Sequence, residues 1–298
     1  MLPLPPRTPA KRLRDALANP GSRAVILWVV LIVMFAASWQ AFSRGAPASG
    51  AATEAPSPSP DMWRYILNQF LPLLAFPLLF GLFYWRFHSF AAANKRAVDL
   101  MAAGDAAAAA DAFRRLARKP LAPIGVARFN LGLALLRLGD VRGALDAFAA
   151  AERSRAKALR PMIAAMIALC DALAGDLDAA DRWIAEARRR AAGPGATSRV
   201  HLAAEAIVRL RRGDGPGAAR LFDQTWAELE RSTAADLVRA LRVVRAFAAE
   251  QAGGAAGAQA ADLLAGARPF HAREYAWIVA GWPEMARYLL ANGFGAAG

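Results

Sequence analysis

Two long apolar segments near the N-terminus constrain this chain more than any other feature of its sequence. Residues 24–42 form a run of 19 without a charge, and residues 66–85 form a run of 20. At about 1.5 Å per helical residue, each run covers roughly 29 Å, the thickness of the hydrocarbon core of a bilayer. Buried helices of water-soluble proteins are usually shorter, so we expect two transmembrane helices.

Basic residues around these segments predict how the pair is oriented. Residues 1–23 form a tail with five Lys or Arg and one Asp, and three basic residues follow the second segment. Lys and Arg accumulate on the cytoplasmic side of membranes. The loop between the segments, residues 43–65, is rich in Pro, Ser and Ala, which suits a periplasmic connector. The sequence therefore predicts a hairpin anchor with both chain termini in the cytoplasm.

A cleaved signal peptide is the alternative for the first segment, with cleavage among the small residues between Ala46 and Ala52. The long preamble and the long apolar run both favour a retained span. Only four of the 37 basic residues are Lys, and Ala is abundant, a bias typical of GC-rich bacterial genomes. The expected location is therefore the bacterial inner membrane.

A recurring pattern fills most of the remaining chain. A Gly-Asp pair repeats with spacings of 35, 36 and 38 residues, beginning at Gly104, Gly139, Gly175 and Gly213. Five residues after each Gly stands an Ala, and nine residues after it stands a large apolar residue: Phe113, Phe148, Ile184 and Phe222. Gly suits a left-handed helix end and Asp caps the next helix. Repeats of this length predict stacked helical hairpins, with no strands.

These repeats resemble the tetratricopeptide repeat (TPR) family. The best unit, residues 123–155, matches most of the family pattern with Leu131, Gly132, Leu135, Gly139, Asp140, Ala144, Phe148 and Ala151. It departs at Arg128, where the family often has Trp, and Ala168 and Ala206 replace the glycine of the best unit. The resemblance covers residues 91–292 and implies an all-α fold: a two-helix transmembrane hairpin followed by a cytoplasmic TPR-like α-solenoid of about five to six helical hairpins.

The resemblance also implies a binding surface, because the first helices of such hairpins line a concave groove that holds a peptide or a partner helix. Carried over to this chain, the groove would contain Phe129, Asn130, Leu133, Arg137, Leu169, Ile207 and Arg211. The alternative for the apolar members is packing between repeats, and for Leu169 and Ile207 the two interpretations have equal weight.

A second candidate surface is basic. The formal net charge is +13, and arginines gather around the third and fourth units at Arg188, Arg189, Arg190, Arg209 and Arg212. The expected interpretation is a solvated basic face, with anionic lipid or an acidic protein as the alternatives. Nucleic acid is not favoured, because no aromatic residues are interleaved with these cations as stacking platforms.

Catalytic chemistry finds little support in the sequence. No phosphate-binding loop, dinucleotide fingerprint or metalloprotease motif is present. One Cys and three His are too few for a structural zinc site, and we expect Cys170 to be a buried hydrophobe. We therefore expect no metal, no cofactor and no enzymatic activity.

The function that these features predict is a membrane-anchored scaffold or assembly factor that recruits a protein partner through its solenoid. The alternative is an accessory subunit of a larger membrane enzyme or transport complex. That subunit would bind through its transmembrane helices, with Asn68, Gln69, Pro72 and Pro77 at the interface. The partner's identity and the oligomeric state stay open at this point.

Overall fold

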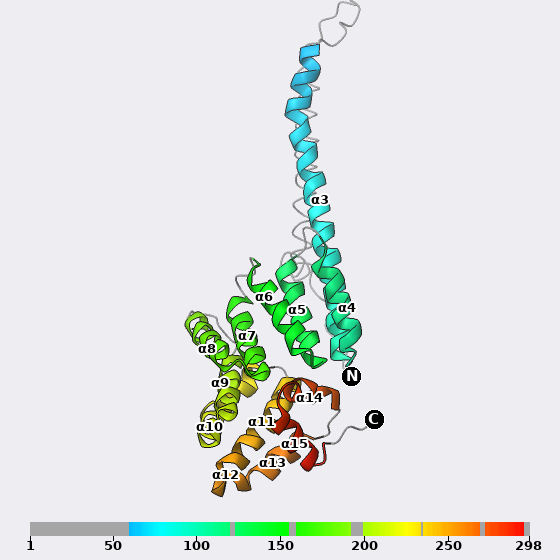
Figure 1. Cartoon of the computed structure of the whole chain (residues 1–298). Coiled ribbons are helices and arrows are strands. Elements are labelled where there is room, and N and C mark those ends of the chain that lie inside the picture. The colour runs from blue at the N-terminus through cyan, green and yellow to red at the C-terminus, as the bar shows by residue number, and fades with distance from the viewer. Residues whose placement is uncertain are drawn as a thin grey trace, which may run out of the picture. The chain divides into compact units, whose positions relative to one another are not determined.

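The computed structural model of the chain describes residues 60–119, 123–154, 159–191, 199–233, 235–268 and 272–294. Side chains are described from residue 79 onward, except at positions 236, 272 and 273. All regular secondary structure in these ranges is helical, with no strand (Figure 1). The helices are α3 (Pro60–Ala102), α4 (Ala106–Ala117), α5 (Ile124–Arg137), α6 (Val141–Glu152), α7 (Arg160–Ala174), α8 (Leu177–Ala191), α9 (Val200–Arg211), α10 (Gly215–Ser232), α11 (Ala235–Ala252), α12 (Gly254–Ala258), α13 (Ala260–Ala265), α14 (Ala272–Val279) and α15 (Pro283–Ala291).

The chain divides into two units, residues 1–84 and residues 85–298, and we call the second the helical body. The expected first span, residues 24–42, the basic tail and most of the connecting loop lie outside the described residues. The backbone of the expected second span, residues 66–85, is helical within α3, but its side chains before residue 79 are not described. A search of the described residues finds no helix that combines the length and the apolar character needed to cross a membrane.

Within the body, each helix from α4 to α10 packs on the next helix along the chain. Tight turns reverse the chain within each hairpin, because Gly104, Gly139, Gly175 and Gly213 all adopt positive φ, between +79° and +91°. This is the left-handed conformation expected for them from the sequence. The Asp after each of these glycines accepts a hydrogen bond from a backbone N–H three residues further on and so caps the following helix.

The body's core repeats the same packing from hairpin to hairpin. Phe113, Phe148 and Phe222 are fully buried, and Ile184 is almost so. The closest approach is between α5 and α6, where a Cβ on Gly132 would lie 2.6 Å from the Phe148 ring. Gly132 therefore lets these two helices pack closely, which a larger residue would prevent.

The C-terminal part of the body differs from the earlier hairpins. Two adjacent glycines, Gly253 and Gly254, adopt positive φ after α11, and two short helices, α12 and α13, follow. The last hairpin, α14 and α15, packs against α5 and α11. A Cβ on Gly139 would lie 3.2 Å from the carbonyl oxygen of Ala276. The end of the chain thus returns to an early turn, a contact that the repeat pattern does not predict.

Candidate functional site

The groove residues expected on α5 all make contacts inside the body. Phe129 is buried, with its ring centroid 5.5 Å from that of Phe148. The Asn130 side-chain amide donates to the Asn94 side chain on α3, at 3.0 Å, and Leu133 is half-buried against the core. These three residues therefore join α5 to its neighbours.

Two expected groove arginines occupy equivalent places in their hairpins. Arg137, at the end of α5, donates to the Met101 carbonyl oxygen near the end of α3, at 3.0 Å. Arg211, at the end of α9, donates to the Leu173 carbonyl oxygen near the end of α7, at 2.8 Å. Each guanidinium thus satisfies a carbonyl at the C-terminal end of the first helix of the preceding hairpin, where a cation is favourable.

Leu169 and Ile207 are both fully buried, on α7 and α9. These two helices pack directly on each other. The structure therefore places both side chains in the packing between neighbouring hairpins, which is the second of the two interpretations given above.

Arg211 also contacts the C-terminal hairpin. The same Nη1 donates to the Gly281 carbonyl oxygen at 3.0 Å, and the guanidinium lies 5.7 Å from the centre of the Trp282 ring. A Cβ on Gly281 would lie 3.1 Å from the Leu173 carbonyl oxygen. The α14–α15 turn therefore covers the ends of α7 and α9.

Beside this contact lies an open concavity of about 610 Å³. It is bounded by the turn between α9 and α10, the end of α11, and α15. The residues that line it are Leu210, Arg211, Gly213, Gly215, Phe247, Glu250, Gln251, Trp282, Glu284, Arg287, Tyr288, Ala291 and Asn292. Its rim carries charges of both signs, and its floor is aromatic.

The floor of the concavity is a cluster of three aromatic rings. Phe247 lies 5.7 Å from Trp282 and 5.0 Å from Tyr288, centroid to centroid. The Tyr288 hydroxyl oxygen is inaccessible to solvent, and its acidic neighbour is Glu250. Burial raises the pKa of Tyr288 above its usual value, and the nearby Glu250 carboxylate raises it further.

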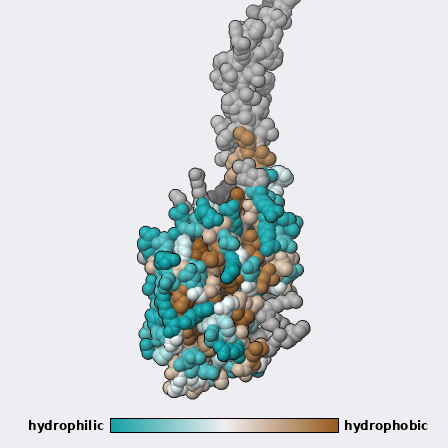
Figure 2. Space-filling view, viewed as in Figure 1, coloured by the Kyte–Doolittle hydropathy of each residue, from teal (hydrophilic) through white to brown (hydrophobic). Residues whose placement is uncertain are grey.

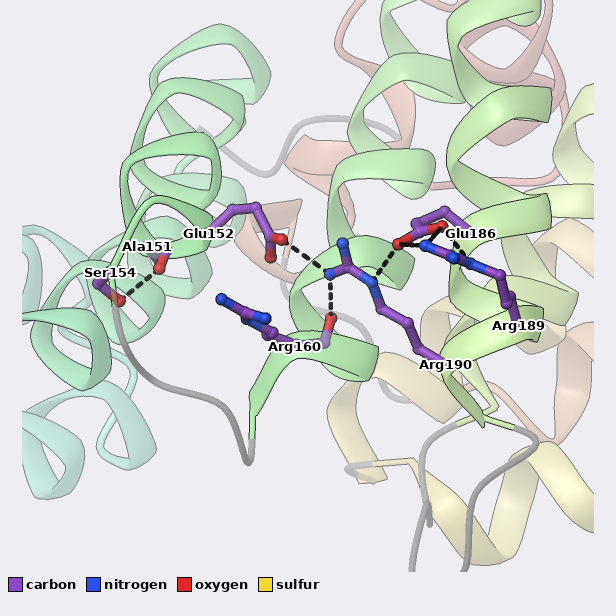
Figure 3. Close-up of polar contacts among 7 residues, drawn as sticks. All are labelled: Ala151, Glu152, Ser154, Arg160, Glu186, Arg189 and Arg190. Carbon is purple, nitrogen blue, oxygen red and sulfur yellow. Dashed lines mark hydrogen bonds and ion pairs between the residues drawn. The ribbon is translucent and has the colours of Figure 1, made fainter.

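The expected basic face is an ion-pair network in the structure (Figure 3). Arg190 pairs with Glu152 on α6 at 2.9 Å and with Glu186 on its own helix at 2.5 Å, and it donates to the Arg160 carbonyl oxygen. Arg189 also pairs with Glu186, at 2.6 Å. Hydrogen bonds from Arg189 and Arg190 lower the pKa of Glu186 to about 2. The network ties together the ends of α6 and α8 and the start of α7.

The other basic-face arginines are paired as well. Arg188 and Arg209 both contact Glu205 on α9. Arg212 pairs with Asp181 on α8 at 2.7 Å and with Asp178 at 3.4 Å. All five arginines of this face thus have acidic partners, which reduces the positive charge available to an external anion.

Two buried titratable groups lie near the C-terminal end of α7. Burial raises the pKa of Asp171 to about 6, and Asp176 adds to the rise while Arg182 opposes it. Burial and the neighbouring Asp171 also raise the pKa of Cys170, which is fully buried. His201 on α9 has a lowered pKa, chiefly because it is buried. Among the described residues no group of His, Cys, Asp and Glu is arranged to hold a metal ion.

Comparison with known proteins gives no relative: no family model, no curated protein and no solved structure matches this chain.

Of the seven residues expected in the groove, only Arg211 lines the concavity. Sequence reasoning missed the aromatic floor, Phe247, Trp282 and Tyr288, because these residues come from two elements about 35 positions apart and follow no repeat. One available signal was Trp282, a large aromatic residue between a turn glycine and a helix-initiating proline. The longer-range ion pairs of the basic face carried no signal either, since Glu152 and Glu205 pair with Arg190 and Arg188 on another helix. The spacings of Glu186 with Arg190 and of Glu205 with Arg209 were available signals, because residues four apart on a helix are neighbours.

Proposed function

We propose that this protein is a membrane-anchored scaffold that recruits a protein partner through a TPR-like helical-repeat domain. In this proposal the two apolar segments form a hairpin in the bacterial inner membrane, and the helical body lies in the cytoplasm. The sequence pattern of four Gly-Asp turns and the order in which α4 to α10 pack support the repeat architecture.

The observation that carries the proposal is the continuity of α3. This single helix begins at Pro60, contains the apolar segment and ends at Ala102, where the first Gly-Asp turn follows. Its large apolar side chains between positions 79 and 87 are unusually exposed, from 52% to 65%: Leu79, Leu82, Phe83, Trp85 and Phe87. Phe90, one turn later, is buried in the body's core. Exposed apolar residues of this density favour contact with lipid.

The concavity lined by Arg211 is the surface that we propose for the partner. Figure 2 shows a largely hydrophilic face of the body, with hydrophobic residues gathered mainly in its middle. The exposed charges at the concavity rim, Arg287 and Glu284 on α15 and Glu250 on α11, fit a partner segment that carries both signs of charge. The aromatic rings beneath them supply a rigid floor, which is the kind of anchor that binding hot spots use.

Affinity purification of the full chain from native membranes in mild detergent tests this proposal. The informative variant is Glu250→Lys/Arg287→Glu, which reverses two exposed rim charges. The matched control, Arg142→Glu/Asp146→Lys, reverses two exposed charges on α6 that do not line the concavity. We expect wild type and control to retain the same partner and the rim variant to lose most of it. Equal recovery by all three chains would contradict the proposed site and favour the alternative of an accessory subunit bound through its transmembrane helices.

A further inference from the structure

The ends of the helices form two distinct edges of the body. The last turns of α4, α6 and α8 and the first turns of α5 and α7 lie on one edge, which we call the loop edge. Contacts across it support this grouping: Arg190 at the end of α8 reaches Glu152 at the end of α6, and Arg128 near the start of α5 donates to the Ala150 carbonyl oxygen. The Gly-Asp turns form the opposite edge.

Five exposed cations lie on the loop edge and make no ion pair with any described residue. They are Arg115, Arg118 and Lys119 at the end of α4, Arg153 at the end of α6, and Arg160 at the start of α7. The acidic residues of this edge, Glu152 and Glu186, are already paired with Arg190. The loop edge therefore carries a surplus of positive charge that the arginine network does not neutralise.

Helix capping explains only part of this surplus. Cations at the ends of α4 and α6 complement the negative ends of the helix dipoles. Arg160 does the opposite, because it stands exposed at the first residue of α7, where a cation is unfavourable. The Gly-Asp edge, by contrast, presents the exposed carboxylates of Asp105, Asp140, Asp176 and Asp214. Exposed acidic residues therefore recur along the Gly-Asp edge, whereas the loop edge carries the five cations that lack an ion pair within the described residues.

The first helix of the body enters at the loop edge. Asn130 contacts Asn94 and Arg137 contacts Met101, and both pairs are 36 residues apart, so α5 and the last part of α3 run parallel in one register. Ile124, the first residue of α5, is then level with position 88 of α3. The exposed side chains of Trp85 and Phe87 therefore lie just beyond the loop edge.

We propose that the loop edge of the body lies against the anionic headgroups of a lipid bilayer. The inference rests on the proposed function, because it takes the apolar part of α3 to be the membrane anchor. Unpaired cations beside exposed aromatic and apolar side chains match an anionic interface, where cations contact headgroups and aromatic rings lie at headgroup level. An acidic protein would satisfy the cations and leave Trp85 and Phe87 unexplained.

Lysine labelling of the full chain tests this contact with native residues. The chain is inserted into nanodiscs of phosphatidylcholine alone or of phosphatidylcholine with about 30 mol% phosphatidylglycerol, and an amine-reactive reagent is followed by mass spectrometry. Lys119 lies on the loop edge, whereas exposed Lys95 lies about two helical turns from it on α3 and serves as the internal reference. We expect Lys119 labelling to fall at least about threefold in the anionic nanodiscs, with Lys95 unchanged.

Salt and charge reversal complete the test. In 1 M salt the protection of Lys119 should disappear while the chain stays inserted, because the Debye length falls to about 3 Å. Arg115→Glu/Arg118→Glu/Arg153→Glu should abolish the protection, whereas the control Arg142→Glu/Arg220→Glu, near the Gly-Asp edge, should keep it.

Three failing outcomes remain distinguishable. Equal Lys119 labelling in both nanodiscs, with the chain inserted, would overturn the lipid contact and leave the proposed anchor intact. Protection of Lys119 in native membranes but in neither nanodisc would overturn the lipid contact and favour an acidic protein at the loop edge. A chain that enters neither nanodisc would contradict the proposed anchor itself.

Discussion

Gly132 is the residue at which the sequence pattern and the packing agree most directly. The glycine of the best repeat unit lies against the ring of Phe148, so its missing side chain is what allows α5 and α6 to approach. We predict that Gly132→Ala lowers the free energy of unfolding by about 1–3 kcal/mol, because the new methyl would overlap the ring. Thermal unfolding of the full chain in detergent, followed by circular dichroism, measures the change.

Gly257→Ala is the matched control for that substitution. Its Cβ would meet only the Ala249 carbonyl oxygen, at an ordinary 3.7 Å, and its backbone is helical. We expect no loss of stability, since alanine favours a helix over glycine. Equal destabilisation by both substitutions would show that the close approach at Gly132 is not the cause.

Asp171 gives a prediction for pH. Its pKa is raised to about 6 from an ordinary value of 3.8, so the native state holds its proton more tightly than the unfolded state does. The contribution of this carboxyl to the free energy of unfolding is fully present below pH 4 and is lost as the pH rises through about 6. Asp171→Asn should therefore stabilise the protein at pH 7 by about 1–3 kcal/mol and have little effect at pH 4. If the free energies of unfolding of both chains changed equally between pH 4 and pH 7, the burial argument would be refuted.

At the scale of single residues, sequence reasoning identified the turn glycines and capping aspartates because each has a local backbone requirement. It did not identify the pairing of Arg190 with Glu152 or the burial of Asp171. Those depend on which hairpin end lies beside which, and that is a property of packing over 30 or more residues.

The capping interaction of α10 shows how one residue defines an element. Asp214 accepts from the Gly217 backbone N–H at 2.8 Å, which satisfies one of the free donors at the start of the helix. Asp214→Ala should cost about 1 kcal/mol of unfolding free energy, whereas Asp214→Asn should cost only a few tenths because the amide oxygen still accepts. Unfolding by urea in detergent compares the two. An Asn variant as unstable as the Ala variant would mean that the carboxylate acts through its charge.

The contact between the ends of α6 and α8 depends on Arg190 rather than on the basic face as a whole. Arg190 and Glu152 are each about one-fifth exposed, and the second oxygen of Glu152 is buried without a partner. Arg190→Ala would leave this carboxylate uncompensated, so we predict a loss of about 2 kcal/mol. Neighbouring Arg189 is 77% exposed, and Arg189→Ala should produce little measurable change. Equal effects of the two substitutions on the melting temperature would contradict this assignment.

At the scale of elements, the periodicity of the sequence predicted the hairpins as far as α10 well, because each one repeats the same turn and core positions. The pattern weakens after Gly213. The position of the C-terminal hairpin, with Ala276 against Gly139 and Gly281 against Leu173, has no sequence signal, because close packing there needs only small residues that are common in this chain.

For the molecule as a whole, the helical class could be predicted from the absence of strand-like alternation and from the repeat. The concavity could not, since it forms only where the last hairpin returns to α9 and α11. The basic face could be located but not interpreted, because its net charge depends on acids contributed by other helices. The proposed anchor is supported by the length and continuity of α3 and by its exposed apolar side chains.

The most direct test of the central claim compares what two chains retain from native membranes. One is the full chain, and the other begins at Trp85 and so keeps the whole helical body, including buried Phe90. Circular dichroism first verifies that the shorter chain is helical. The account predicts that both chains retain the same protein partner, with the shorter chain released from the membrane. Retention of the partner by the full chain alone would place recognition in the apolar segments and contradict the claim that the helical body recruits it.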